Sequence, residues 1–178
     1  MGLCMSYDEK KSAAEFQRRN THGDGLLHKE ELMKYIDRHA VMWSMLAVNL
    51  NLDVDECKKI AFQVMLNLVT AGEDTMNQNQ FETFNTKFVL DPKGYLEFFQ
   101  RTVFAAFDTD NDGVIDDTEL DVFVNIFYAA DSIFAGDARL PDDKNELKSS
   151  IKKSFDQNHD GKLTFEEIRP IISGSVTV

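Results

Sequence analysis

Residues 108–119 read DTDNDGVIDDTE and place acidic side chains at short, regular intervals around one glycine. This spacing suits a loop that wraps a single hard cation, because Ca²⁺ takes about six to eight oxygen ligands and Gly113 permits the sharp turn between them. The pattern is specific, since several positions of the loop must agree at once. We therefore predict a calcium site whose ligands, at loop positions 1, 3, 5, 7, 9 and 12, are Asp108, Asp110, Asp112, the carbonyl of Val114, Asp116 and Glu119.

Residues 156–167, DQNHDGKLTFEE, repeat the pattern with fewer acidic ligands. Neutral Asn158 and Thr164 stand where the earlier loop has carboxylates, so the loop at 108–119 is expected to hold Ca²⁺ more tightly. Two calcium sites are thus predicted, with Mg²⁺ as a candidate competitor. The predicted ligands of this second site are Asp156, Asn158, Asp160, the carbonyl of Lys162, Thr164 and Glu167.

Residues 20–31, NTHGDGLLHKEE, form a weaker copy in which several ligands are replaced. Imidazole is a poorer partner for Ca²⁺ than a carboxylate, so His22 weakens the case for a third site. Calcium binding and a purely structural loop both remain open here, and a transition metal held by His22 and His28 is the lesser alternative. The candidate metal ligands of this copy are Asn20, His22, Asp24, the carbonyl of Leu26 and Glu31.

A fourth copy, VTAGEDTMNQNQ at residues 69–80, is found only by its register. Val69 and Ala71 stand where carboxylates are needed, and Gln80 replaces the closing glutamate, so this loop should not bind Ca²⁺. In chain order we call the four segments the first loop (20–31), the second loop (69–80), the third loop (108–119) and the fourth loop (156–167). Position 8 of each loop should form a short β-bridge with its mate, Leu27 with Met76 and Ile115 with Leu163.

The repeat of helix–loop–helix units predicts an all-α fold with two pairs of units, residues 1–92 and residues 93–178. Lys93-Gly94 is interpreted as the hinge between the pairs. A capping-box signal at Asp53 predicts a helix over residues 54–68, and a helix should restart near Pro141. Apolar periodicity predicts a stripe of Leu96, Phe99, Val103, Phe104 and Phe107, and burial is also expected for Met42, Trp43, Met45 and Leu46.

An excess of 31 acidic over 19 basic residues gives the 178-residue chain a net charge of −12. This balance argues against nucleic-acid binding, which needs clusters of Lys and Arg. Two cysteines, Cys4 and Cys57, cannot make a disulfide framework, and no signal peptide or membrane span is recognised, which favours a cytoplasmic location. The histidines have no nucleophile at a recognisable spacing, so an enzyme is not expected.

The first six residues, MGLCMS, match a pattern for myristoylation of Gly2 after removal of Met1. Palmitate on Cys4 would supply the second anchor that stable membrane binding needs. The prediction is a peripheral membrane contact through an acylated N-terminus. The alternative is a chance match to a short pattern just before a helix.

These motifs resemble those of the calmodulin superfamily of four-EF-hand proteins, over roughly residues 12–172. The weak first loop, the substituted second loop and the long segments between loops look like sarcoplasmic calcium-binding proteins and calexcitin. The segment LPDDKNEL looks more like neuronal calcium sensors, whose Cys-Pro in the first loop is absent here. The resemblance implies an intracellular calcium sensor that engages a target protein helix; the alternative is a calcium buffer, and a lesser alternative is a carrier of an apolar small molecule.

Overall fold

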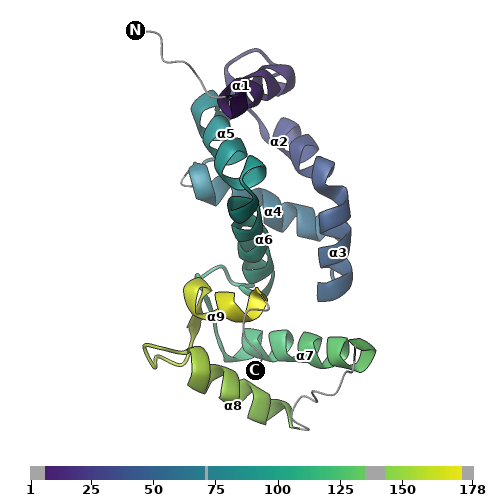
Figure 1. The fold of residues 1–178 in the computed structure, drawn as a ribbon, viewed down its shortest axis with the longest axis vertical. Coiled ribbons are helices and arrows are strands. Elements are labelled where there is room, and N and C mark those ends of the chain that lie inside the picture. Colours follow the sequence, from purple (N-terminus) through teal and green to yellow (C-terminus); the bar gives the residue numbers. More distant parts are fainter. Residues whose placement is uncertain (1–6, 71, 135–142, 174–178) are drawn as a thin grey trace. The chain divides into compact units, whose positions relative to one another are not determined.

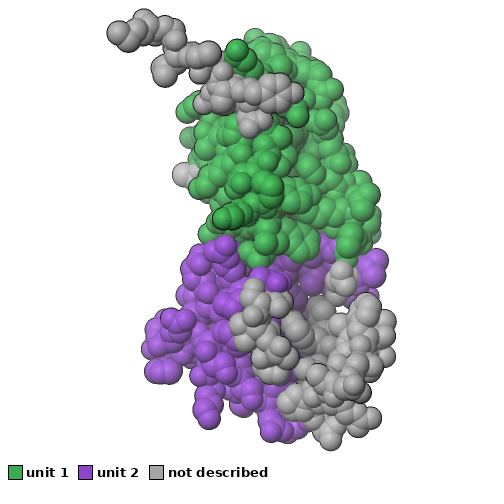
Figure 2. Space-filling view, viewed as in Figure 1, with its two compact units in different colours: residues 1–45, 53–102 green, residues 46–52, 103–178 purple. Residues whose placement is uncertain are grey.

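The computed structural model describes residues 7–70, 72–134 and 143–173, and helices make up most of them (Figure 1). The chain groups into two compact units, residues 1–45 with 53–102 and residues 46–52 with 103–178 (Figure 2). We call these the first unit and the second unit. Two of the divisions fall inside helices, α3 (Ala40–Leu50) and α6 (Pro92–Phe107). The division of the chain into functional pairs at residues 92 and 93 stays a prediction.

Each unit contains two helix–loop–helix segments joined by a pair of short strands. The first unit contains α1 (Tyr7–Arg19), β1 (Leu26–Leu27), α2 (Lys29–Ile36), the 3₁₀ turn η1 (Asp37–His39), the start of α3, α4 (Val54–Val69), β2 (Met76–Asn77), α5 (Gln78–Phe84), the π-helical η2 (Asn85–Leu90) and most of α6. The second unit contains the ends of α3 and α6, β3 (Val114–Ile115), α7 (Asp117–Phe134), α8 (Lys144–Phe155), β4 (Leu163–Thr164) and α9 (Phe165–Ile172).

The short strands confirm the predicted pairing of the loops. β1 runs antiparallel to β2 with Leu27 opposite Met76, and β3 runs antiparallel to β4 with Ile115 opposite Leu163. All four side chains are fully buried. A slip of one residue would turn them toward solvent, so the hydrophobic effect fixes the register of each bridge. The predicted all-α fold, with one bridge in each pair of helix–loop–helix units, is confirmed.

Side chains at the N-termini set where several helices begin. The Asp53 carboxylate accepts a hydrogen bond from the backbone N–H of Asp55 at 2.8 Å, and α4 begins at Val54, as the capping signal predicted. The helix ends at Val69, one residue beyond the predicted end. α8 begins at Lys144 with Asp143 as its cap. The predicted restart near Pro141 lies outside the described residues.

Aromatic rings fill the core of the first unit. The Trp43 indole is fully buried, its N–H donates to the Ile36 carbonyl at 2.8 Å, and its ring meets the Phe98 ring edge-on at 5.9 Å between centroids. The expectation that Met45 is buried was wrong, because its side chain is 62% exposed. Two positions along a helix are roughly 200° apart, so burying Trp43 turns Met45 to the opposite side of α3.

Gly94 does not form the predicted hinge. Lys93 and Gly94 lie in the first turn of α6, where the Gly94 N–H donates to the Asp91 carboxylate at 2.9 Å. A Cβ added to Gly94 would lie 1.7 Å from the carbonyl oxygen of Lys87. Glycine is therefore needed for the close approach of α6 to η2, which is a packing requirement and not a hinge.

Candidate metal centres

The third loop brings three of its predicted ligands together between α6 and α7. The carboxylates of Asp108, Asp110 and Asp112 each offer an oxygen, and these oxygens lie within 4.8 Å of one another. Asp108 follows the last residue of α6 and is buried, whereas Asp110 and Asp112 are exposed. Three hard oxygens at this separation are suitable ligands for a divalent cation such as Ca²⁺.

Position 1 of both the third and the fourth loop carries a buried carboxylate oxygen without a partner. The Oδ2 atoms of Asp108 and Asp156 accept hydrogen bonds from the N–H groups of Gly113 and Gly161, at 3.1 and 2.9 Å. Their Oδ1 atoms are the buried side-chain atoms of the described residues that have no hydrogen-bond partner. An unpaired buried acceptor is costly, and burial raises the pKa of Asp108. A cation bound in each loop would pair the Oδ1 atom of the aspartate at position 1 of that loop, so the residues fit Ca²⁺.

The closing glutamates hold the backbone of their loops. Glu119 is buried; its Oε1 accepts from the N–H and the hydroxyl of Thr109 at 2.7 and 2.9 Å, and its Oε2 accepts from the N–H of Asp116 at 3.1 Å. In the fourth loop, Glu167 accepts from the N–H of Gln157 at 2.9 Å and of Thr164 at 2.9 Å. The Thr164 backbone N–H bond lowers the pKa of Glu167, so this carboxylate is ionised near neutral pH.

The third and fourth loops share one backbone conformation. Position 4 has a positive φ of 59° in both, at Asn111 and His159, and position 6 has a positive φ of 87° at Gly113 and 84° at Gly161. Two turns of this kind curl the chain so that alternate side chains point to one centre. The first loop has the same signs at Gly23 and Gly25, with φ of 71° and 84°.

The first loop pairs its acids internally. The Asp24 carboxylate lies 2.7 Å from His28 Nε2, and that hydrogen bond lowers the pKa of Asp24. Glu31 is buried and accepts from the N–H and hydroxyl of Thr21, both at 2.6 Å, while His22 Nδ1 lies 3.2 Å away. Burial acts to raise the pKa of Glu31, but these hydrogen bonds and one from the His28 N–H lower it to about 2. Both predicted acids therefore already have partners.

The remaining candidate ligands of the first loop have contacts within the loop or with the neighbouring strand. The Asn20 side-chain oxygen accepts from the Gly23 N–H at 2.9 Å, and Leu26 lies on β1 opposite Asn77. The rings of His22 and His28 lie 5.0 Å apart at an edge-on angle. Among the described residues, three metal-ligating acids or histidines come together only at Asp108, Asp110 and Asp112. Calcium binding by the first loop stays a prediction that the geometry does not favour.

The second loop acts as a structural partner in this arrangement. Asn77 and Gln80 cap α5 reciprocally, because each side chain accepts from the backbone N–H of the other, at 3.0 and 2.8 Å. Met76 fills the core beside Leu27. That this loop does not bind Ca²⁺ stays a prediction, which rests on the lack of a carboxylate at positions 1 and 3. Gly2 and Cys4, the predicted lipidation sites, lie outside the described residues.

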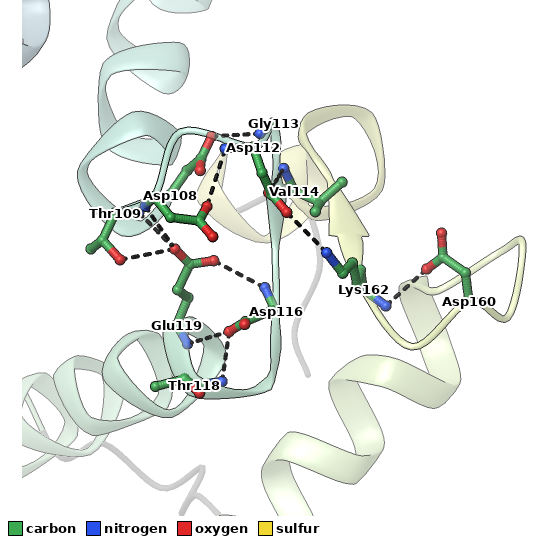
Figure 3. A network of polar contacts seen from close by, with 11 residues as sticks. Asp108, Thr109, Asp112, Gly113, Val114, Asp116, Thr118, Glu119, Asp160 and Lys162 are labelled. Atoms are coloured by element: carbon green, nitrogen blue, oxygen red, sulfur yellow. Dashed lines mark hydrogen bonds and ion pairs between the residues drawn. The ribbon is translucent and has the colours of Figure 1, made fainter.

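Sequence reasoning missed the side chain of Lys162. The loop pattern assigned only its carbonyl, yet its ammonium reaches the neighbouring loop and lies 2.9 Å from Asp112 Oδ2 (Figure 3). The predicted bridge between Ile115 and Leu163 contained the signal, because an antiparallel pair with this register places residue 162 opposite residue 116. Loop position 7 should therefore be read together with the ligands of the opposite loop.

Residues 97–173 match the family model of an EF-hand domain pair. A solved structure of a PP2A PR70 holoenzyme contains a similar chain, with 17% sequence identity and a TM-score of 0.44. That alignment covers 97% of this chain and 56% of the other, so this chain spans little more than half of that length. The matched residues include both loops in which the position 1 aspartate has a buried oxygen without a partner, and the match supports calcium binding by residues 97–173.

None of the described helices combines the length with the apolar character that crossing a membrane requires.

Proposed function

We propose that this protein is a calcium sensor that binds two Ca²⁺ ions, one in the third loop and one in the fourth. The observation that carries the proposal is the buried, unpaired Oδ1 atom at position 1 of both loops. Ca²⁺ would supply the missing partner, and Mg²⁺ is expected to compete for the same oxygens. The ligands are the ones predicted from the sequence, from Asp108 to Glu119 and from Asp156 to Glu167.

The position of Glu119 supports a conformational response to Ca²⁺. Glu119 lies in the first turn of α7, whereas Asp108 follows the end of α6. To coordinate an ion with both oxygens, Glu119 would have to give up hydrogen bonds from Thr109 and Asp116. Because the carboxylate is attached to α7, this exchange would pull α7 relative to α6.

Buried aromatic side chains lie between α6, α7 and α9. The rings of Phe107 on α6 and Phe123 on α7 meet edge-on at 4.9 Å between centroids, and Phe104 meets Phe165 of α9 at 5.7 Å. Separating these helices would expose part of this cluster. We propose that the exposed surface binds an apolar helix of a target protein.

The cellular setting belongs to the same proposal. We propose an intracellular, cytoplasmic protein that acts by binding and not by catalysis, with acylation at Gly2 and Cys4 as a further hypothesis for peripheral membrane contact. Kinship with the sarcoplasmic calcium-binding proteins or with the neuronal calcium sensors is also part of the proposal.

A calcium buffer is the alternative, and the packing of the first unit favours it. Tyr35 is in edge-on contact with Phe81 and Phe84, at 5.1 and 6.4 Å, and Phe84 meets Phe98 at 5.1 Å. Such interlocked rings resist opening. The carrier alternative has less support, because a cavity of about 320 Å³ in this unit is lined by charged Lys11, Glu15 and Arg38.

Calorimetry combined with the fluorescence of an apolar dye tests the proposal. The full chain should bind two Ca²⁺ ions, and dye fluorescence should rise with calcium loading. Glu119→Gln and Glu167→Gln should each remove one site, whereas Glu166→Gln, which changes the exposed neighbour of Glu167, should keep both. Two bound ions without a rise in fluorescence would favour the buffer, and absence of calcium binding would exclude both functions.

A further inference from the structure

Lys162 is the one residue that belongs to both predicted sites of the EF-hand pair. Its carbonyl is the position 7 ligand of the fourth loop, and its ammonium lies 2.9 Å from Oδ2 of Asp112, the position 5 ligand of the third loop (Figure 3). A ligand oxygen of the third loop is therefore already paired with a positive charge. That charge belongs to the protein itself and cannot diffuse away.

The backbone fixes this arrangement. β3 and β4 pair with Val114 opposite Thr164 and Ile115 opposite Leu163, which places Lys162 opposite Asp116 in the same register. The hydrogen bond to Asp112 raises the pKa of Lys162, and the charges of Asp110 and Asp116 raise it further. The ammonium thus contacts Asp112 directly and is attracted by two further acids of the third loop at longer range.

We propose that the Lys162 ammonium is a tethered cation that competes with Ca²⁺ for the third loop and lowers the calcium affinity of that loop. The inference rests on the proposed calcium binding. The ammonium pairs with Oδ2 of Asp112, so this carboxylate has less negative charge to offer Ca²⁺ through either oxygen, and the two positive charges repel each other while the ion enters. This competition lowers calcium affinity only in the third loop.

The competition works in one direction. Position 7 of the third loop is Val114, which lies opposite Thr164 and brings no charge to the fourth loop. Acid count alone predicts that the third loop binds more tightly, with five acidic ligands against three. Lys162 reduces this advantage, so the two sites should have closer affinities than their compositions suggest.

Lys152 provides a matched control. Its ammonium lies 2.5 Å from Asp117, which occupies position 10 of the same third loop and is not a predicted ligand. Lys152→Gln and Lys162→Gln therefore each remove one positive charge and one ion pair with the third loop. They differ in whether the paired acid is a predicted ligand of the ion, and Asp117 also keeps a second ion pair with Lys148 at 3.3 Å.

The test measures the calcium dissociation constant of the third loop in the full chain carrying Glu167→Gln, by calorimetry and by the amide resonance of Gly113. In that background, Lys162→Gln should lower the dissociation constant by about fivefold. Lys152→Gln should change it by less than about twofold. Lys162→Arg, which keeps the positive charge, should have a dissociation constant close to that of the parent. The difference between Lys162→Gln and its parent should shrink at high salt, because exposed charges are screened.

An unchanged dissociation constant in Lys162→Gln, or an equal change in Lys152→Gln, would overturn the inference while leaving the proposed calcium binding intact. Circular dichroism of each variant establishes that it is folded. A chain with the native sequence that binds no Ca²⁺ at all would overturn the proposed function and this inference together.

Discussion

The first and the third loop have nearly the same backbone conformation but differ in whether their acidic side chains already have partners. Both turn with positive φ at positions 4 and 6, and both close with a buried glutamate that accepts hydrogen bonds from a threonine at position 2. In the first loop, Asp24 and Glu31 lie beside the rings of His28 and His22. In the third loop, Asp108 keeps one buried oxygen without a partner. The backbone conformation of an EF-hand loop and its capacity to bind an ion are thus separate properties.

Replacing the neutral and imidazole groups should turn the first loop into a calcium site, which is the largest effect we expect. The triple variant Asn20→Asp, His22→Asp, His28→Asp supplies carboxylates at positions 1, 3 and 9 and removes the partner of Asp24. It should gain a third bound Ca²⁺ with an affinity at least about 100-fold above that of the native first loop. Calorimetry counts the ions.

The corresponding control replaces only His22 and His28 with Asn, which removes both imidazoles without adding charge. It should not gain the third ion. If the triple variant also fails to gain it, missing carboxylates are not what separates the two loops.

Removing the closing carboxylate should affect the two loops in different ways. Glu119→Gln should weaken calcium binding at the third loop by at least about tenfold, because it removes the charge of the residue that would supply two ligand oxygens. Glu31→Gln should leave the number of bound Ca²⁺ ions unchanged. Calorimetric titration of both variants compares them, and loss of an ion in Glu31→Gln would contradict the difference described here.

Glu31 should matter for stability instead. Glu31→Ala leaves the N–H groups of Thr21 and His28 without their acceptor in a part-buried site, which should cost about 2 kcal/mol in the free energy of unfolding. Chemical denaturation monitored by circular dichroism measures this loss. The exposed neighbour Glu30 provides the control, since Glu30→Ala should change the stability little. Equal effects of the two substitutions would rule out a structural role for the Glu31 carboxylate.

Lowering the pH should also remove the contribution of the Glu31 carboxylate to the free energy of unfolding. The pKa of Glu31 falls from an ordinary 4.5 to about 2, so its stabilising effect is complete above about pH 4.5 and is lost as the pH falls toward 2. The difference in melting temperature between the native chain and Glu31→Ala should therefore narrow over this range. Thermal melts of the native chain and of Glu31→Ala, recorded at steps between pH 6 and pH 2.5, check this narrowing.

The fold was predictable because the repeat of helix–loop–helix units fixes it. Position 8 must be apolar and must pair with its counterpart, so Leu27 with Met76 and Ile115 with Leu163 followed directly from the loop register. The start of α4 followed from Asp53, whose carboxylate can cap only the helix that begins beside it. The repeat supplies the long-range pairing because each loop has the same register, and the helix start depends only on neighbouring residues, so both could be predicted from one sequence.

Tertiary packing explains what could not be predicted. α6 is apolar on more than one face, so periodicity alone selected Leu96, which is 52% exposed, and overlooked Phe98, which is 2% exposed in the aromatic core. Gly94 looked like a hinge because nothing in the sequence indicates that the Lys87 carbonyl approaches it. For Lys162, the register of the bridge indicates that the side chain lies near the third loop, but the side-chain conformation that brings its ammonium to Asp112 does not follow from the loop pattern.

A calcium titration followed by the backbone amide resonances of Gly25, Gly113 and Gly161 tests the central claim most directly. These glycines occupy position 6 of the first, third and fourth loops, and the N–H groups of Gly113 and Gly161 donate to the position 1 carboxylates. As Ca²⁺ fills the third and fourth loops, the resonances of Gly113 and Gly161 should shift. The resonance of Gly25 should stay in place throughout that filling. A parallel shift of Gly25, or no shift of the other two, would contradict the account.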